Sequence, residues 1–273
     1  MPYVSALIDG EARIARLEAD GTYTPLSGPS ELGPATDVDT LASLQPAGPG
    51  VAASEVTLRP LVPRAGKILC VGLNYHDHVT ETKRELPTYP VLFPKYASNL
   101  IAPDGAIAKP AETAQLDYEA ELAVVIGRTG RRISEADAPA HVLGYATAND
   151  VTVRDFQYKT HQWLQGKAWD DTTPLGALST PDEVDVSDAR ITLTLNGETL
   201  QDASTADLIF SIPFLIATVS QFTQLNPGDI LLTGTPGGVG FRRDPQVFLQ
   251  PGDEVTVEIG GLGAITNRVV AED

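Results

Sequence analysis

The chain has very little cysteine: Cys70 is the only one among 273 residues. A single cysteine cannot form an internal disulfide, so we expect a protein of a reducing compartment. No apolar run approaches the roughly 18 residues of a membrane-spanning helix. Residues 1–10 also lack the basic start and apolar centre of a secretory signal. These absences together predict a cytosolic protein with no membrane partner.

Positive charge is also scarce. Lysine and arginine together number 19 against 36 aspartates and glutamates, which gives a formal net charge of −17. Nucleic acids and anionic membranes are bound by clustered basic side chains, so partners of both kinds are excluded. A small anionic substrate would need positive charge that is concentrated locally at its site.

The remaining composition is that of a folded globular protein, with 42% hydrophobic and 20% charged residues. Residues 1–60 carry two hairpin signals, Asp9-Gly10 and Asp20-Gly21, and then a Gly- and Pro-rich stretch. We therefore predict a small strand-rich N-terminal domain over residues 1–60. Residues 64–273 hold the dense apolar segments and nearly all of the candidate chemistry, and are predicted to form the second domain.

Hydrophobic periodicity predicts the fold class of the larger region. Residues 190–195 and 254–259 alternate as half-buried strands do, whereas residues 122–126 are continuously apolar and indicate a strand buried on both faces. Residues 208–220 show a helical pattern, with Pro213 near the first turn. Strands outnumber helices and do not alternate with them regularly. We therefore predict a mixed α+β fold rather than a doubly wound sheet.

Three acids occur at alternate positions directly before the continuously apolar segment. Asp117, Glu119 and Glu121 would share one face of a strand that runs into the core. Buried carboxylates repel one another, and a bound cation is a usual remedy. Asp150, which also follows a strand-like segment, is the natural third oxygen ligand beside Glu119 and Glu121. The alternative is that Asp150 caps a helix that begins near Thr152.

A second cluster contains His78 and Glu81. On a helix, a spacing of three places them on one face, where the carboxylate can orient the imidazole and raise its basicity. An incidental pair on a surface helix is an equally simple interpretation. A zinc pair of His76 and His78 would need further histidines after later strands. Only His141 and His161 remain, which disfavours that third interpretation.

Two further segments carry candidate chemistry. Lys167 follows a glycine and lies between two tryptophans. It is either an ordinary surface charge or a group that stabilises a substrate carboxylate or a developing oxyanion. The glycine-rich stretch 227–240 contains Thr235 but lacks the pattern of a P-loop or a dinucleotide fold. It is either a tight turn or a backbone segment that approaches a small ligand closely.

These segments together resemble the fumarylacetoacetate hydrolase family over roughly residues 64–270. The resemblance rests on the order and spacing of short matching stretches, which lie at residues 72–75 with His78 and Glu81, 117–122, 149–151 with Arg154, Asp155 and Gln157, 166–167 with Asp170, 174–176, 196–198, 233–240, 251–253 and 267–268. It implies a mixed β-sandwich or β-roll, and an N-terminal region like the small extra domain of many bacterial members. It also implies a homodimer with Mg²⁺ or Mn²⁺ held by Glu119, Glu121 and Asp150.

The resemblance further implies roles for individual residues. His78 and Glu81 would activate water, and Lys167 would face an oxo-acid. The implied substrate-binding residues are Thr235, Gln157, Asn74 and Gly234.

Such a site is expected to act on small anionic 2-oxo or 2,4-dioxo dicarboxylic acids, as a hydrolase of acylpyruvate-type carbon-carbon bonds or an oxaloacetate decarboxylase. The alternatives are an isomerase or decarboxylase of hydroxy-heptadienedioates from aromatic catabolism and an oxaloacetate keto-enol tautomerase. A more distant alternative is a non-catalytic binding protein stabilised by metal, but such a protein would need none of His78, Glu81 and Lys167.

Overall fold

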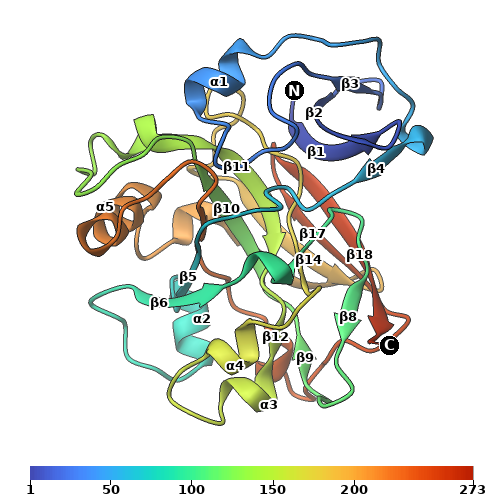
Figure 1. The fold of residues 1–273 in the computed structure, drawn as a ribbon. Coiled ribbons are helices and arrows are strands. Elements are labelled where there is room, and N and C mark those ends of the chain that lie inside the picture. Colours follow the sequence, from blue (N-terminus) through green and yellow to red (C-terminus); the bar gives the residue numbers. More distant parts are fainter. Residues whose placement is uncertain (273) are drawn as a thin grey trace.

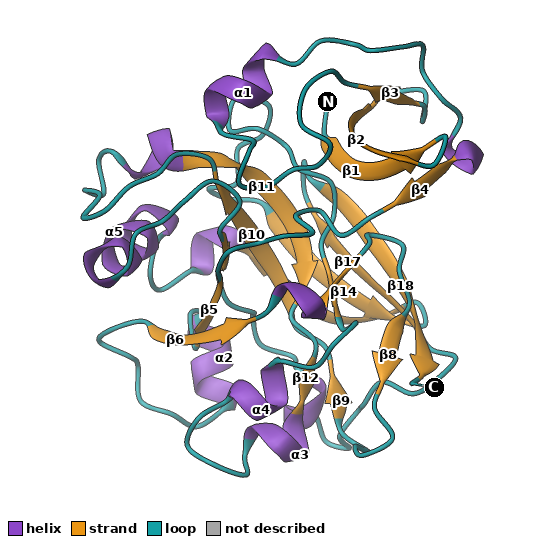
Figure 2. Cartoon of the chain, in the orientation of Figure 1, coloured by secondary structure: helices purple, strands orange, loops and turns teal. Residues whose placement is uncertain are grey.

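Strands dominate the computed structural model, which describes residues 1–272 (Figure 1, Figure 2). They form a four-stranded sheet, two five-stranded sheets and two short strand pairs. Most helices are short and lie at the ends of strands rather than covering whole sheets (Figure 2). The predicted mixed α+β class is therefore confirmed.

The four-stranded sheet is built from the N-terminal residues. Its order is β3 (Tyr23–Pro25), β2 (Glu11–Leu17), β1 (Tyr3–Ile8) and β4 (Val56–Leu58). Asp9 and Gly10 join β1 to β2 with positive φ at both residues, 52° and 78°, as the predicted two-residue hairpin requires. Ile14 of β2 packs in the same apolar cluster as Ile68 of the larger region. The division into two domains stays a prediction.

The first five-stranded sheet forms the centre of the larger region. Its order is β11 (Val142–Asn149), β10 (Ala120–Ile126), β16 (Ile230–Leu232), β5 (Ile68–Gly72) and β6 (Val91–Lys95). Strands β16 and β5 are parallel, and the other neighbours are antiparallel. Every residue of β10 is buried, because both of its edges are paired and different apolar clusters cover its two faces. This confirms that residues 122–126 are buried on both faces.

The second five-stranded sheet packs against β10 and β11. Its order is β15 (Glu198–Ser204), β14 (Arg190–Leu195), β17 (Glu254–Ile259), β18 (Gly263–Ala271) and β8 (Ile107–Lys109). Burial alternates along β14 and β17, as predicted, and their inward side chains share a core with Leu122 of β10. The two short pairs are β12 (Thr152–Val153) with β9 (Leu116–Asp117), and β13 (Thr173–Pro174) with β7 (Leu100–Ile101).

The α-helices are α1 (Val38–Ser43), α2 (His76–Glu81), α3 (Arg154–Gln157), α4 (Leu164–Lys167) and α5 (Ile212–Phe222). Single 3₁₀ turns lie at η1 (Ala53–Glu55), η2 (Ala97–Asn99), η3 (Ala138–His141), η4 (Thr205–Asp207) and η5 (Gly240–Arg242). Within residues 1–272, no helix is both long and apolar enough to cross a membrane.

Helix α5 begins four residues later than the predicted 208. Asn74 holds the preceding segment in a non-helical conformation, because its Oδ1 accepts the Phe210 N–H at 2.7 Å. Ser211 then caps the helix by accepting the Phe214 N–H, and proline follows in the first turn as expected. The periodicity located the helix, but a tertiary hydrogen bond decided where it starts.

Candidate active site

The central sheet brings the three predicted metal ligands together. Glu121 lies in β10, Glu119 directly precedes that strand, and Asp150 directly follows β11. Antiparallel pairing of β10 with β11 brings Asp150 next to Glu119, although the two are far apart in sequence. The Asp150 N–H donates to the Glu119 carbonyl at 2.8 Å. One carboxylate oxygen from each residue lies within 4.8 Å of the others, and all three side chains are buried. The continuous strand expected through Asp117 is instead broken at residues 118 and 119.

One oxygen of each carboxylate contacts a basic or N–H group of the protein, and none of these three contacts was foreseen. Lys95 Nζ donates to Asp150 Oδ1 at 2.6 Å. Arg154 Nη2 forms an ion pair with Glu119 Oε1 at 2.7 Å. The Gly234 N–H donates to Glu121 Oε2 at 2.8 Å. The other oxygens of Glu119 and Asp150 both accept from Lys167, whose Nζ lies 2.6 and 2.8 Å from them.

These contacts also show what Asp150 and Asp117 do in the structure. Asp150 is held by lysines and caps no helix, because α3 begins at Arg154 without a side-chain cap. Asp117 accepts from Arg154 Nε at 2.7 Å and from the backbone N–H groups of Gly240 and Phe241. Asp117 is absent from the triad and orients Arg154, which in turn contacts Glu119.

Negative charge is incompletely balanced in this cluster. Burial would raise the pKa of Glu119, but the charges of Lys167 and Arg154 outweigh it and lower that pKa to about 2. Burial, together with the charges of Asp150 and Glu119, raises the pKa of Glu121. Within residues 1–272, Glu121 has no salt bridge. The donor set is entirely oxygen and lacks one positive charge beside Glu121, so it fits a hard divalent cation.

Lys167 is a buried ammonium group rather than a surface charge. Its side chain is 2% exposed. Burial would lower its pKa, but the charges of Asp150 and Glu119 outweigh that effect and raise it. Lys167 therefore keeps its proton and supplies fixed positive charge to the cavity.

The His78 and Glu81 pair forms as the helical spacing predicts. Both residues lie on α2, and His78 Nδ1 is 2.7 Å from Glu81 Oε1. The other oxygen of Glu81 accepts the Gly238 N–H at 2.8 Å, which fixes the carboxylate. With Glu81 ionised, Nδ1 is the donor and Nε2 is the basic nitrogen. His78 lines the same cavity as Glu119, Glu121 and Lys167.

Of the four predicted substrate-binding residues, Thr235 and Gln157 line this cavity. Gln157 Oε1 accepts from Arg154 Nη1 at 3.0 Å. Asn74 and Gly234 are not among the lining residues. The Asn74 amide donates to the Thr233 and Phe210 carbonyls, and so fixes the strand end that carries Gly234 and Thr235. Direct substrate contact by Asn74 and Gly234 stays a prediction.

Sequence reasoning missed Lys95 and gave Arg154 no role. Lys95 ends the apolar strand β6, and a lysine in that position was a usable signal, since it must find a buried partner. Arg154 follows Asp150 by four residues, but no local pattern shows that it reaches Asp117 and Glu119, more than 30 residues earlier in the chain.

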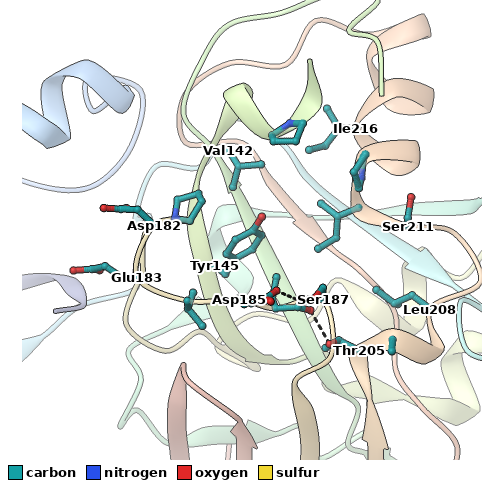
Figure 3. A pocket seen from close by; sticks show the side chains of 17 residues that line it. Val142, Tyr145, Asp182, Glu183, Asp185, Ser187, Thr205, Leu208, Ser211 and Ile216 are labelled. Atoms are coloured by element: carbon teal, nitrogen blue, oxygen red, sulfur yellow. Dashed lines mark hydrogen bonds between the residues drawn. The ribbon is translucent and has the colours of Figure 1, made fainter. Parts of the chain in front are cut away.

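A larger cavity, of about 590 Å³, lies between β11, the 181–187 segment and the start of α5 (Figure 3). Apolar side chains line most of it, including Val142, Leu208 and Ile216, and its charged lining residues are all acidic. None of the predicted catalytic or metal-binding residues lines it. We therefore place the candidate active site at the smaller cavity around the carboxylates.

Sequence comparisons relate this chain to a known family and to named proteins. The family described as fumarylacetoacetate (FAA) hydrolase C-terminal matches residues 67–270. A rat protein named oxaloacetate tautomerase Fahd2a, mitochondrial, is 46% identical over 225 residues, which cover 81% of this chain and 72% of the rat protein. The human protein named oxaloacetate tautomerase FAHD2A, mitochondrial, is 47% identical over 221 residues, covering 80% and 70% of the two chains.

Solved structures match the whole chain. A 5-carboxymethyl-2-hydroxymuconate delta-isomerase from Mycobacterium smegmatis superposes with a TM-score of 0.85 at 31% identity, covering 100% of both chains. A fumarylacetoacetate hydrolase from Exiguobacterium antarcticum superposes with a TM-score of 0.84 at 33% identity, also covering 100% of both. With residues 67–270 matched in sequence and the whole chain matched in structure, the protein belongs to the fumarylacetoacetate hydrolase family.

Proposed function

We propose that this protein is a divalent-metal-dependent enzyme of 2-oxo dicarboxylic acids and that it catalyses keto-enol tautomerisation of oxaloacetate. The observation that carries the proposal is the convergence of the Glu119, Glu121 and Asp150 carboxylates, the Lys167 ammonium and the His78 imidazole on one cavity. Relatives named oxaloacetate tautomerase, at 46 to 48% identity, support the choice of reaction.

The cofactor we propose is Mg²⁺ or Mn²⁺, held by Glu119, Glu121 and Asp150. When bound there, it would supply Lewis acidity to a 2-oxo acid that chelates it through its carboxylate and oxo oxygens. Lys95, Arg154 and the Gly234 N–H each hold one carboxylate oxygen, so the ligands are already oriented before a cation arrives.

His78 is the proposed general base. Its Nε2 would remove a proton from C3 of oxaloacetate, and Glu81 on Nδ1 would stabilise the imidazolium that forms. The electron pair moves onto the 2-oxo oxygen, where the buried charge of Lys167 would stabilise the enolate. A proton then reaches that oxygen to give the enol. Thr235 and Gln157 would orient the substrate from the cavity wall.

A second candidate is hydrolysis of an acylpyruvate. The same His78 and Glu81 arrangement can deprotonate a water that attacks the distal carbonyl, with the pyruvate enolate as leaving group. A structural match named fumarylacetoacetate hydrolase favours keeping this candidate. Decarboxylation of oxaloacetate uses the same electron sink but needs no base, so loss of His78 would spare it.

The test is turnover of oxaloacetate, acetylpyruvate, fumarylpyruvate and a hydroxy-heptadienedioate, each with Mg²⁺, with Mn²⁺ and after chelation. We expect rapid loss of the oxaloacetate enol absorbance only with metal, and loss of that activity in Glu121→Gln. The matched control is Glu258→Gln, because Glu258 lies on the exposed face of β17. Full activity of Glu121→Gln after chelation would show that the metal proposal is wrong.

His78→Ala separates the candidate reactions. We expect it to reduce tautomerisation and hydrolysis by about 100-fold or more, the usual contribution of a general base. Decarboxylation of oxaloacetate should fall far less. Equal loss of all three activities would contradict the role given to His78.

The proposal includes a homodimer in the cytosol that binds neither nucleic acid nor membrane. Light scattering coupled to gel filtration gives the mass in solution directly. A mass near twice the 29.0 kDa of one chain is the expected result.

A further inference from the structure

The cavity around the carboxylates is lined by two arginines that pair with none of its acids. Its basic lining residues are Arg84, Arg154, Lys167 and Arg242, and its acidic ones are Glu119 and Glu121. Lys167 and Arg154 are engaged in ion pairs with acids of the site. In a chain of net charge −17, two further arginines at this cavity are a local excess of positive charge.

Arg84 and Arg242 have no acidic partner within residues 1–272, since neither forms a salt bridge or a side-chain hydrogen bond there. Each instead lies on an aromatic ring that lines the same cavity. The Arg84 Cζ is 5.5 Å from the centre of the Trp163 ring, and the Arg242 Cζ is 5.0 Å from that of Phe241. A ring under a guanidinium restrains the side chain but leaves its in-plane N–H donors free.

Both arginines line the inner cavity and are exposed to solvent, which places them at its mouth rather than beside the buried triad. The inner cavity beside the triad has a volume of only about 30 Å³, and an outer pocket of about 390 Å³ adjoins it. The two share Arg84, Phe93, Tyr158 and Trp163 as lining residues, and the outer pocket contains no acid. The inner volume leaves room only for the reacting end of a substrate, so its other end has to lie toward the mouth.

We infer that Arg84 and Arg242 bind the carboxylate at the substrate's distal end, and that they make this site selective for dicarboxylates over 2-oxo monocarboxylates. This inference rests on the proposed function, because that function places the 2-oxo acid end of the substrate at the triad. Guanidinium groups recognise carboxylates through paired N–H donors, which suits a ligand whose far end is a second carboxylate. Specificity thus comes from groups remote from the reacting atoms.

The test compares oxaloacetate with its 4-methyl ester, which has the same reacting end but a neutral distal end. Steady-state KM is measured with saturating Mg²⁺, and Kd is measured independently by tryptophan fluorescence, which needs no turnover. The variants are Arg84→Gln, Arg242→Gln, the double variant and Arg84→Lys. Lys83→Gln is the matched control, because Lys83 is the exposed neighbour of Arg84 and does not line the cavity.

The wild-type protein should bind oxaloacetate at least about tenfold more tightly than the ester, as expected when a charged hydrogen-bonded pair is lost. The double variant should bind the two ligands equally, with the ester's Kd unchanged. Arg84→Lys should recover part of the selectivity, and Lys83→Gln should retain all of it.

Equal wild-type Kd values for the two ligands would overturn the inference, as would a parallel weakening of both in the double variant. If the protein discriminates in binding but converts neither ligand, the proposed reaction is wrong and the distal carboxylate site stands.

Discussion

Lys95 shows how much of this site depends on a single buried charge. Its side chain is fully buried at the end of β6, and its ammonium contacts Asp150 Oδ1 at 2.6 Å and the Val151 carbonyl at 3.0 Å. Removing one member of a buried pair leaves the other desolvated and unpaired, which costs far more than the intact pair contributes. Asp150 keeps Lys167 on its other oxygen, so loss of Lys95 would leave the Asp150 Oδ1 atom buried without its charged partner.

Lys95→Met should lower the free energy of unfolding by about 3 to 5 kcal/mol, the range for breaking a buried ion pair. Urea denaturation without added metal measures it. Arg190→Gln is the control, because it breaks an exposed pair with Asp202 and should leave the midpoint almost unchanged. A Lys95→Met midpoint equal to the wild-type value would show that Asp150 needs no partner at this position.

At the scale of elements, two very short helices place the cavity residues against each other. Helix α3 carries Gln157 and α4 carries Lys167, and the two pack closely. Gly166 allows this approach, because a Cβ at that position would lie 2.4 Å from Gln157 Cβ and 2.6 Å from its Cα. This close approach of the two backbones explains why a glycine directly precedes Lys167. The sequence shows the glycine but gives no reason for it.

Gly166→Ala should push α4 away from α3 and displace Lys167 from Glu119 and Asp150. We expect kcat for oxaloacetate to fall by about tenfold or more, because small misplacements of catalytic groups are costly. Gly260→Ala is the control, since its Cβ would meet nothing closer than 3.7 Å. Crystal structures of both variants would locate the lysine. An unchanged kcat with Lys167 in place would contradict this account.

At the scale of the whole molecule, added salt can change stability in two ways, one through the net charge of −17 and one through the buried triad. Any added electrolyte screens general repulsion between surface acids. Only a cation bound at the triad stabilises the native state through a specific equilibrium, by an amount that grows with its concentration relative to Kd. Thermal stability can therefore report metal binding without any assay of activity.

Mn²⁺ or Mg²⁺ at 100 times its Kd should stabilise the fold by about 2.7 kcal/mol and raise Tm accordingly. Sodium chloride at matched ionic strength is the control for screening. The shift beyond that control should disappear in Glu121→Gln, which removes a buried ligand of the triad. A divalent ion that gives no more than the sodium shift in the wild-type protein would refute binding at this site.

Local sequence patterns determined the elements and the chemical types of the main site residues. Period-two burial in β14 and β17, the Asp9-Gly10 hairpin and the helical spacing of His78 and Glu81 all depend on neighbours in the chain, so they can be read from it. Asp150 could be proposed as a third ligand from its residue type and the strand-like segment before it, but its proximity to Glu119 and Glu121 depends on the pairing of β10 with β11.

Only the tertiary structure decided which groups share the buried cavity. Lys95 and Arg154 pair with acids from other segments of the chain, Asn74 sets the start of α5, and Arg84 and Arg242 line one cavity. These contacts join residues far apart in the chain. Their energy comes from desolvation and charge pairing, which depend on where strands and loops meet rather than on sequence spacing.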